Sequence, residues 1–390
     1  MELISILEKI AIPRPNHSEA VKQTAVYLKD LLSSRQIPFS TQEFSVRCHQ
    51  TLLLGVTIII LSVLFLLFIK TRRPFLALFS VLAILGVIIL ENETSFHTIS
   101  SLIQRPGENI FVEFKTPGSQ RELVFAAHYD SKTDVLDHEQ RSIFLKLLPY
   151  MLVMGILISF LTYLSKKFKI LNARPMRSLY LLGAFALVVF SLSAFAWLGG
   201  YIFLGEDKHS PGAVDDGASV AILLKMADEI HQGNLDIGQS DVTILLTDGE
   251  EVGYQGAYHY TKEKYGEEVQ IRNKPVYLFN LELMGQSGTL YHSQKTCSVF
   301  VCYPADADLI ARVVNVWSNI SDKPAEPLRS MTDDSFAFGA IGIPFVTIGN
   351  TGLPGLGYGG FHSTTDGMSR VDPENLQRMS LFLEKIIESY

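Results

Sequence analysis

The chain has 390 residues and a formal net charge of −7, with 33 Lys and Arg against 40 Asp and Glu. This length accommodates one large domain or two ordinary ones. The acidic balance and the lack of a basic patch argue against a nucleic-acid partner. Hydrophobic residues make up 47% of the chain, and the excess is concentrated in four blocks, which is typical of membrane spans rather than of a larger soluble core.

The chain begins with a predicted helix and strand. The segment Ser18–Arg35 repeats apolar residues at helical spacing, and Thr41–Cys48 alternates like a strand. The first ten residues lack the basic region, long apolar region and cleavage site of a secretory signal. We therefore expect no cleavable signal peptide.

Two apolar runs follow and form a predicted transmembrane hairpin. The run Leu52–Ile69 carries no charge and is long enough to cross the hydrocarbon core, and Pro74 begins a second run that ends at Leu90. The short turn between them contains Lys70, Arg72 and Arg73. We expect this hairpin to occupy residues 51–90.

A second predicted hairpin comes after two strands, Glu108–Phe114 and Glu122–Ala127. Its apolar runs are Ile143–Leu164, which tolerates Lys146 near its start, and Leu179–Leu204. The turn between these runs is again basic, with Lys166, Lys167, Lys169, Arg174 and Arg177. Residues 143–204 are therefore predicted as the second hairpin, which gives an integral membrane protein with four transmembrane helices.

The basic turns predict the orientation in the membrane. Positive loops remain on the cytoplasmic side, so both hairpins point the same way and the catalytic domain is expected outside the cytoplasm. The first span must then translocate a tail of about fifty residues without a signal peptide. A transporter is disfavoured, because Lys146 is the charged residue within the four runs and lies near an end, where it can snorkel.

The rest of the chain alternates helices and strands. The predicted elements are Ala218–His231 (helix), Val242–Leu246, Val276–Leu281 and Pro344–Ile348 (strands) and Asn375–Glu388 (helix). This alternation predicts an α/β fold, a three-layer sandwich around a mostly parallel central sheet. The predicted catalytic domain comprises residues 1–50, 91–142 and 205–390.

The chain has three cysteines, Cys48, Cys297 and Cys302. They form no CxxC pair and predict neither a zinc ribbon nor a disulfide framework. Cys297 and Cys302 could pair in an oxidising compartment. The pattern favours small buried hydrophobes.

Acidic and histidine residues recur where the predicted strands end, and open α/β sheets build their sites there. The motifs are HYD at 128–130, GAVDDG at 212–217, TDGEEVG at 247–253, NLE at 280–282 and GGFHSTTD at 359–366. Each motif alone is weak, because a single histidine at a strand end is usually structural and a Glu-Glu pair is usually a solvated turn. Together they supply two imidazoles and three carboxylates with a spare glutamate, which suits two zinc ions that share one carboxylate.

The order HYD, GAVDD, DGEEVG, NLELMG and FHSTTD resembles the zinc peptidases of clan MH, metallopeptidase family 28, which include aminopeptidases and relatives of glutamate carboxypeptidase and glutaminyl cyclase. The resemblance extends to PRPNHSEAVKQTAVYLKDLL and TDDSFAFGAIGIP. It implies the zinc-peptidase (phosphorylase/hydrolase-like) fold, and it does not account for the hairpins. Many relatives have aspartate where this chain has Glu282.

The resemblance implies a role for each motif residue. His128 and Glu282 are expected to hold one zinc ion, Glu251 and His362 the other, and Asp215 to bridge them. Glu250 is the expected general base, and Asp130 is expected to support His128.

The implied function is hydrolysis of N-terminal residues from peptides by a membrane-anchored aminopeptidase. The alternatives are a glutaminyl cyclase-like acyltransferase and a non-catalytic receptor or scaffold. The cyclase shares HYDSK and the glutamate pair but places tryptophans at its site, whereas Trp197 and Trp317 lie far from these motifs. The second hairpin separates Asp130 from Asp215, so we expect membrane-proximal peptides as substrates and the lipid bilayer as a partner.

Overall fold

The computed structural model describes residues 1–92, 99–134, 138–168, 173–198, 208–266, 274–352 and 359–390. Its contacts divide the chain into two compact units. The first unit comprises Met1–Cys48, Gln104–Thr133 and Glu206–Tyr390, and the second comprises His49–Ile103 and Asp134–Gly205. The domain boundaries expected from the sequence remain a prediction and differ from these units at residues 49–50, 91–103, 134–142 and 205.

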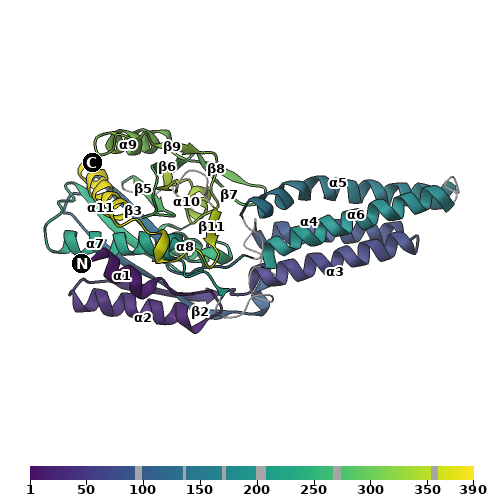
Figure 1. The fold of residues 1–390 in the computed structure, drawn as a ribbon, viewed down its shortest axis with the longest axis horizontal. Helices are drawn as coiled ribbons and strands as arrows, with labels where there is room; N and C mark the ends of the chain where they lie inside the picture. The colour runs from purple at the N-terminus through teal and green to yellow at the C-terminus, as the bar shows by residue number, and fades with distance from the viewer. Residues whose placement is uncertain (93–98, 135–137, 169–172, 199–207, 267–273, 353–358) are drawn as a thin grey trace. The chain divides into compact units, whose positions relative to one another are not determined.

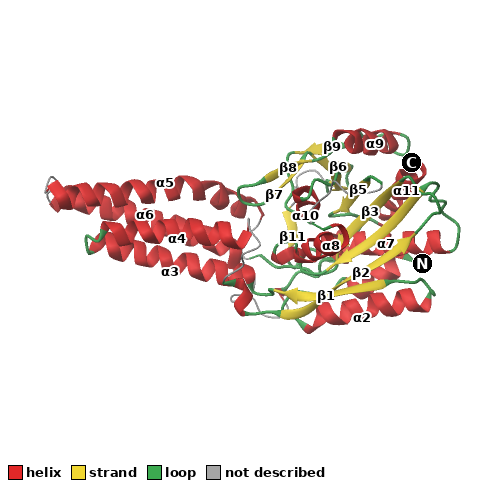
Figure 2. Ribbon diagram, turned by 180° about the vertical axis from the view of Figure 1, so that it is seen from behind, coloured by secondary structure: helices red, strands yellow, loops and turns green. Residues whose placement is uncertain are grey.

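An eight-stranded mixed sheet forms the centre of the first unit (Figure 2). In spatial order the strands are β1 (Ser40–Val46), β2 (Arg105–Phe114), β4 (Ser240–Thr247), β3 (Arg121–His128), β5 (Val276–Leu281), β10 (Phe345–Asn350), β6 (Leu290–Ser293) and β9 (Glu326–Leu328). The four central strands β4, β3, β5 and β10 are parallel to their neighbours within that group. Strands β1 and β2 pair antiparallel, as do β2 with β4 and β6 with β10, while β9 pairs parallel with β6. The predicted mostly parallel central sheet is confirmed.

Helices cover both faces of this sheet (Figure 1). One face packs against α1 (Leu3–Ile10), α2 (Glu19–Ser34), α7 (Ala218–His231), α9 (Ala307–Ser318) and α11 (Pro373–Glu388), and the other against α8 (Gln255–Tyr265) and α10 (Ser335–Ala340). Strand β3 shows why, because Leu123 and Phe125 belong to the first core while Val124 and Ala126 belong to the second. Side chains alternate across a strand, so a strand with apolar residues on both faces needs helices on both sides of the sheet. The predicted three-layer sandwich is confirmed.

In the first unit, the longer predicted elements agree with the structure to within three residues at each end, whereas α5 (His138–Phe168) and α6 (Ala173–Leu198) begin five and six residues before the predicted apolar runs. Helix α7 and strand β5 have the predicted bounds, whereas β2 begins at Arg105, three residues before the predicted start. The short elements were not predicted, among them α1, α10 and the two-stranded hairpin of β7 (Lys295–Cys297) and β8 (Cys302–Pro304). A helix of six or eight residues and a strand of three residues contain too few periods for a hydrophobic pattern to reveal them.

The hairpin of β7 and β8 carries a disulfide bond between Cys297 and Cys302. The interpretation that these two cysteines are small buried hydrophobes is therefore wrong, because pairing across the hairpin brings their sulfur atoms together. The interpretation as a small buried residue holds for Cys48, which is buried.

The second unit consists of four long helices, α3 (Gln50–Lys70), α4 (Pro74–Asn92), α5 (His138–Phe168) and α6 (Ala173–Leu198), with a short 3₁₀ turn at Ser100–Leu102. Among the described residues, three segments are long and apolar enough to cross a membrane, namely α3, α4 and Lys146–Phe168 of α5. The apolar stretch found in α6, Met176–Leu192, is shorter. The predicted end of the fourth span, residues 199–204, lies outside the described residues.

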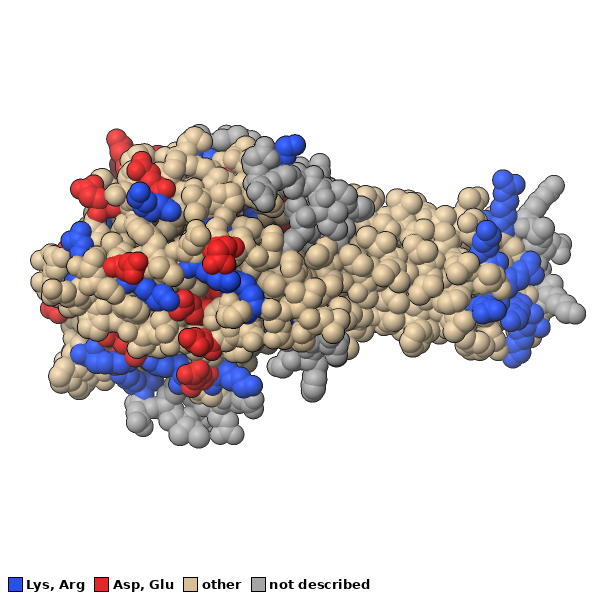
Figure 3. All heavy atoms as spheres, turned by 90° about the horizontal axis from the view of Figure 1, so that it is seen from below, with Lys and Arg blue, Asp and Glu red and all other residues tan. Residues whose placement is uncertain are grey.

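The two basic turns lie at the same end of the helical unit. The ring of Phe75, at the start of α4, contacts the ring of Tyr163 near the end of α5, with centroids 5.4 Å apart. Lys70, Arg72 and Arg73 on one turn and Lys166 and Lys167 on the other are exposed. Figure 3 shows Lys and Arg side chains gathered at one end of these helices. Lys169 lies outside the described residues.

Candidate metal centre and active site

The predicted site residues lie where the parallel strands end. His128 ends β3, Glu282 follows β5, and the Glu250–Glu251 pair follows β4 by two residues. Asp215 lies in the turn before α7, and His362 ends β11 (Gly359–His362). The carboxyl ends of parallel strands meet at one edge of a sheet, so residues up to 234 positions apart along the chain come together there.

Asp215 lies between two imidazole rings. Its Oδ1 atom is 3.2 Å from Nε2 of His128, and its Oδ2 atom is 3.0 Å from Nε2 of His362. Each oxygen of this carboxylate therefore faces a different histidine. A bridging carboxylate between two metal ions requires this placement, with one ion on each side.

The other predicted residues complete the cluster. Oε2 of Glu282 lies 3.7 Å from Nε2 of His128, and Oε1 of Glu251 lies 3.0 Å from Nε2 of His362. Oε2 of Glu250 is 4.0 Å from Nε2 of His128. The structure thus brings the five predicted ligands and the predicted base into one cluster, in two sets that share Asp215; all of these residues are buried except His362, which is partly exposed.

The residues fit a metal centre of the zinc type. Two groups have candidate ligand atoms within 4.8 Å of one another: His128, Asp216 and Glu282, and His128, Asp215 and Glu251. Oε1 of Glu251 is buried and accepts no hydrogen bond from the described residues, although the Nε2 atom of His362 is only 3.0 Å away. Two atoms that approach so closely without hydrogen-bond geometry are placed as ligands of a common cation, and imidazole with carboxylate is a donor set that zinc favours.

Burial and mutual repulsion shift the pKa values of these carboxylates. Burial, with Asp215 adding to it and His128 opposing, raises the pKa of Glu282 to about 8. Burial also raises the pKa of Glu250 well above its usual value, and the neighbouring glutamates add to the rise. Burial lowers the pKa of His128, but hydrogen bonds to Asp130, Asp215 and Glu282 outweigh it and hold that pKa well above its usual value. In this cluster, burial therefore favours protonated glutamates, while the surrounding carboxylates favour the charged imidazole of His128.

Asp130 contacts both the ring of His128 and the backbone of the Glu250–Glu251 pair. Its carboxylate accepts hydrogen bonds from the backbone nitrogens of Gly249 (3.2 Å), Glu250 (3.3 Å) and Glu251 (3.1 Å). Nδ1 of His128 lies 3.1 Å from the carbonyl oxygen of Asp130 and 3.5 Å from its carboxylate. The shorter contact is to the carbonyl, so the backbone and the carboxylate of Asp130 together orient the ring.

Glycines shape the turn that presents the glutamate pair. Gly249 and Gly253 have φ angles of 79° and 101° and bracket the single 3₁₀ turn Glu250–Val252. These left-handed conformations favour glycine, which has no Cβ. His362 also has a positive φ, 58°, which is uncommon for a residue with a side chain. Such conformations concentrate at functional sites.

The sequence reasoning assigned no role to Asp366 or Asp216, which the structure places beside Asp215. The carboxylate of Asp366 accepts hydrogen bonds from the backbone nitrogens of Val214 (2.9 Å) and Asp215 (3.3 Å) and thereby holds the bridging loop. Burial raises the pKa of Asp366 to about 7. Asp216 accepts a hydrogen bond from the backbone nitrogen of His128 at 3.3 Å. The sequence signals were available, since both residues belong to the quoted motifs GAVDDG and GGFHSTTD.

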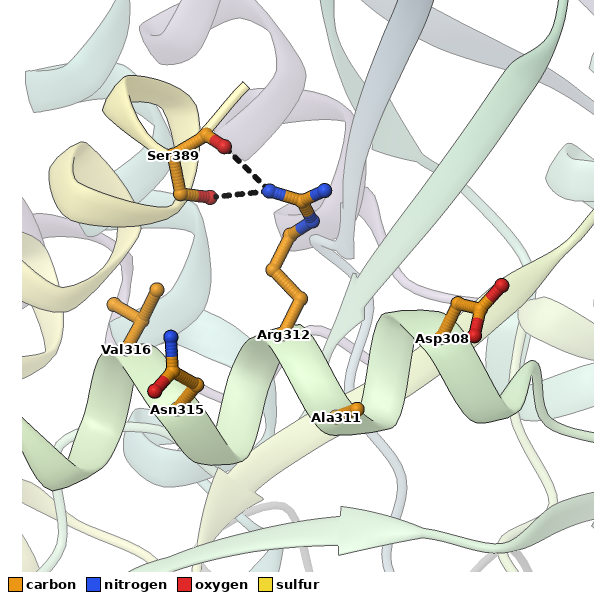
Figure 4. A pocket seen from close by; sticks show the side chains of 6 residues that line it. All are labelled: Asp308, Ala311, Arg312, Asn315, Val316 and Ser389. Carbon is orange, nitrogen blue, oxygen red and sulfur yellow. Dashed lines mark hydrogen bonds between the residues drawn. The ribbon is translucent and has the colours of Figure 1, made fainter.

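A separate pocket of about 390 Å³ lies between α9 and the end of the chain (Figure 4). Arg312 crosses it and donates hydrogen bonds to the backbone and hydroxyl oxygens of Ser389. Its lining contains none of the predicted ligands, so it belongs to a different part of the first unit from the metal centre.

The chain is similar to known zinc exopeptidases and glutaminyl cyclases. The family model "Peptidase family M28" matches residues 199–387, and the comparison with curated protein sequences gives no match. Similar solved structures include a leucine aminopeptidase precursor from Bacteroides thetaiotaomicron (TM-score 0.55, 12% identity, 100% of this chain and 96% of that one) and a Zn-dependent exopeptidase from Parabacteroides distasonis (0.55, 15%, 100% and 97%). Another is a glutaminyl cyclase from Porphyromonas gingivalis (0.54, 14%, 100% and 97%). At these identities the likeness shows the fold.

Proposed function

We propose that the chain is a membrane-anchored two-zinc aminopeptidase of peptidase family M28, whose family model matches residues 199–387. The observation that carries the proposal is the position of Asp215, whose two carboxylate oxygens face Nε2 of His128 and Nε2 of His362 at 3.2 and 3.0 Å. Such an arrangement serves two metal ions better than one, because each histidine has its own oxygen.

We propose that the two zinc ions have three ligands each and share one of them. His128 and Glu282 would hold the first ion, Glu251 and His362 the second, and Asp215 would bridge them. When bound, zinc lowers the pKa of a coordinated water and polarises the scissile carbonyl. The carboxylate of Asp216 lies close to His128 and Glu282, so it can add to the negative charge around the first ion.

Glu250 is the proposed general base. Its Oε2 atom lies 4.0 Å from Nε2 of His128, on the same side as the proposed ligands. It is buried and not itself required as a ligand, so its carboxylate is available to accept a proton from water and return it to the leaving amine. The neighbouring Glu251 has its Oε1 atom 3.0 Å from Nε2 of His362, so the two glutamates contact different histidines.

A glutaminyl cyclase is the second candidate, because two classes of enzyme occur among the similar structures. The tryptophans favour the aminopeptidase. Trp317 is buried in the core of the first unit, packs edge-on against Phe382 and donates a hydrogen bond to the carbonyl of Lys323. Trp197 belongs to α6 of the helical unit. Neither residue belongs to the elements that carry the candidate ligands.

The membrane topology proposed from the sequence is four spans with the catalytic unit outside the cytoplasm. Three helices of sufficient length and hydropathy support insertion. The basic turns share one end of the helical unit and support a single orientation for both hairpins. The disulfide Cys297–Cys302 supports an oxidising compartment for the catalytic unit. Because residues 134–205 are inserted between Asp130 and Asp215, we propose membrane-proximal peptides as substrates.

Detergent-purified protein tests the proposal against a panel of aminoacyl-chromophore substrates and a peptide with N-terminal glutamine, with metal content measured in parallel. Chelator-sensitive release of N-terminal residues with about two zinc ions per chain supports it. Cyclisation of the glutamine peptide without hydrolysis of the panel would move the assignment to the cyclase. A second preparation, with both hairpins replaced by short linkers, tests the substrate class. Full activity of that preparation on small soluble peptides would argue against membrane-proximal substrates.

A further inference from the structure

Asn16 is a buried amide that connects two charged groups near the metal centre. Its Nδ2 atom donates a hydrogen bond to Oδ2 of Asp130 at 2.6 Å, and its Oδ1 atom accepts one from Nη2 of Arg105 at 2.9 Å. The side chain is 2% exposed. The guanidinium of Arg105 in turn donates hydrogen bonds to both carboxylate oxygens of Asp248, at 2.8 and 2.6 Å.

The orientation of this amide is fixed by its two neighbours. A guanidinium can only donate hydrogen bonds, and an ionised carboxylate can only accept them. An amide placed between them must point its oxygen at Arg105 and its NH₂ group at Asp130. Arg105 also donates from Nε to the backbone carbonyl of Asn16, which holds the backbone at this position as well. The amide is therefore a fixed donor to Asp130.

Each carboxylate oxygen of Asp130 accepts two hydrogen bonds from the described residues. Oδ1 accepts from the backbone nitrogens of Gly249 and Glu250, and Oδ2 accepts from Glu251 and from Asn16. Without Asn16, Oδ2 would keep one backbone donor, and this buried carboxylate could rotate. Rotation would disturb both groups that Asp130 holds, namely the ring of His128 and the turn that carries the two glutamates.

We propose that Asn16 is a positioning residue of the metal centre, acting through Asp130 on His128 and on the Glu250–Glu251 turn. This inference rests on the proposed two-zinc function. Asn16, Arg105 and Asp248 come from three separate segments: the loop before α2, the start of β2 and the end of β4. The hydrogen bonds among these three residues connect the N-terminal segment to the site. They also account for the burial of the polar side chain of Asn16, which lies outside any helix or strand.

Glycosylation does not explain Asn16, although it opens the triplet Asn16-His17-Ser18. The amide nitrogen is buried and already donates to Asp130, so it is unavailable for modification in the folded chain. The variant Ser18→Ala removes the triplet and keeps the amide, and it serves as a control for this alternative.

The experiment compares the full-length protein in detergent with Asn16→Ala and Asn16→Asp. Zinc affinity is measured by competition with a chelator, kcat and KM with the best substrate of the panel, and the melting temperature after zinc removal. Asn234 provides the matched control, because its exposed amide also donates to a carboxylate, that of Glu229, at 2.9 Å.

We expect Asn16→Ala to lower zinc affinity and kcat by about 10- to 100-fold each and to leave KM within about twofold. Asn16→Asp should lower both further, because it places a second carboxylate against Asp130. Asn234→Ala and Ser18→Ala should match the unmodified protein. If Asn16→Ala fails to fold, Arg105→Gln keeps Asn16 and removes the group that orients it, and the same two losses are expected.

A lower melting temperature with unchanged zinc affinity and unchanged kcat in Asn16→Ala would overturn the proposal, since it would assign a structural role alone. Unchanged values in Arg105→Gln would overturn it if that variant has to be used. Failure of the proposed function looks different: the unmodified protein would bind no zinc, or would bind zinc and hydrolyse none of the substrates. In the second case zinc affinity still decides the role of Asn16.

Discussion

Nε2 of His362 lies 3.0 Å from Oδ2 of Asp215. His362 reaches this position from β11, and Asp215 from the turn before α7. The opposite oxygen of Asp215 faces His128, so a single carboxylate joins the two halves of the proposed metal centre. A change at Asp215 should therefore alter the metal content of the protein.

Asp215→Asn should lower the zinc content from about two ions per chain to one or fewer. The amide keeps one carbonyl oxygen and loses the second anionic oxygen, so the two half-sites no longer share a ligand. The measurement is metal analysis after equilibration in a zinc buffer. Asp236→Asn is the control, because Asp236 is exposed and accepts a hydrogen bond only from the nearby backbone nitrogen of Gly238 among the described residues. Two retained ions in Asp215→Asn would contradict a bridging role.

The adjacent glutamates should separate metal binding from catalysis. Glu250→Gln should keep both zinc ions and lower kcat by about 10²- to 10⁴-fold, the range of a lost general base. Glu251→Gln should lose zinc from the second half-site, because Oε1 of Glu251 faces His362 at 3.0 Å. Metal analysis and kcat are measured on both variants. Equal zinc loss in both, or full activity of Glu250→Gln, would refute the assigned roles.

Zinc affinity should rise with pH between about 6 and 8. Burial raises the pKa of Glu282 to about 8, and hydrogen bonds to carboxylates, although opposed by burial, hold the pKa of His128 well above its usual value. Glu282 therefore carries a proton in the metal-free protein below about pH 8, the raised pKa of His128 favours its protonated form, and zinc must displace these protons. Each proton released makes affinity increase about tenfold per pH unit. Calorimetry in buffers of different ionisation enthalpy measures the release. An affinity that does not change across this range would disagree with these pKa shifts.

The membrane orientation predicts the accessibility of engineered cysteines. In a Cys48→Ser background, Thr71→Cys lies in the exposed turn between α3 and α4, and Asn234→Cys lies on the surface of the catalytic unit. A membrane-impermeant thiol reagent should modify Thr71→Cys only from the cytoplasmic side and Asn234→Cys only from the opposite side. Modification of both positions from one side would exclude the proposed topology.

The sequence predicted the sheet well because its central strands are buried on both faces. Strand β3 contains the unbroken apolar run Leu123–Ala127 directly before His128, and such runs are typical of strands that are buried on both faces. It also predicted the candidate cluster, since the ligand types stand at strand ends, which the fold brings to one edge.

The supporting contacts could not be predicted in the same way. Asn16 lies 114 positions from Asp130 along the chain, and its contact with that carboxylate depends on how the loop before α2 folds. No periodicity encodes such a contact, and asparagine in a polar loop usually faces solvent. The pairing of Cys297 with Cys302 likewise depends on a hairpin of two three-residue strands, which is too short to show alternation.

Anomalous diffraction at the zinc absorption edge, from crystals of the zinc-loaded protein, tests the central claim most directly. The account predicts two peaks on opposite sides of the Asp215 carboxylate, one beside His128 and Glu282 and the other beside Glu251 and His362. A single peak, or peaks away from these residues, would contradict a two-zinc centre bridged by Asp215.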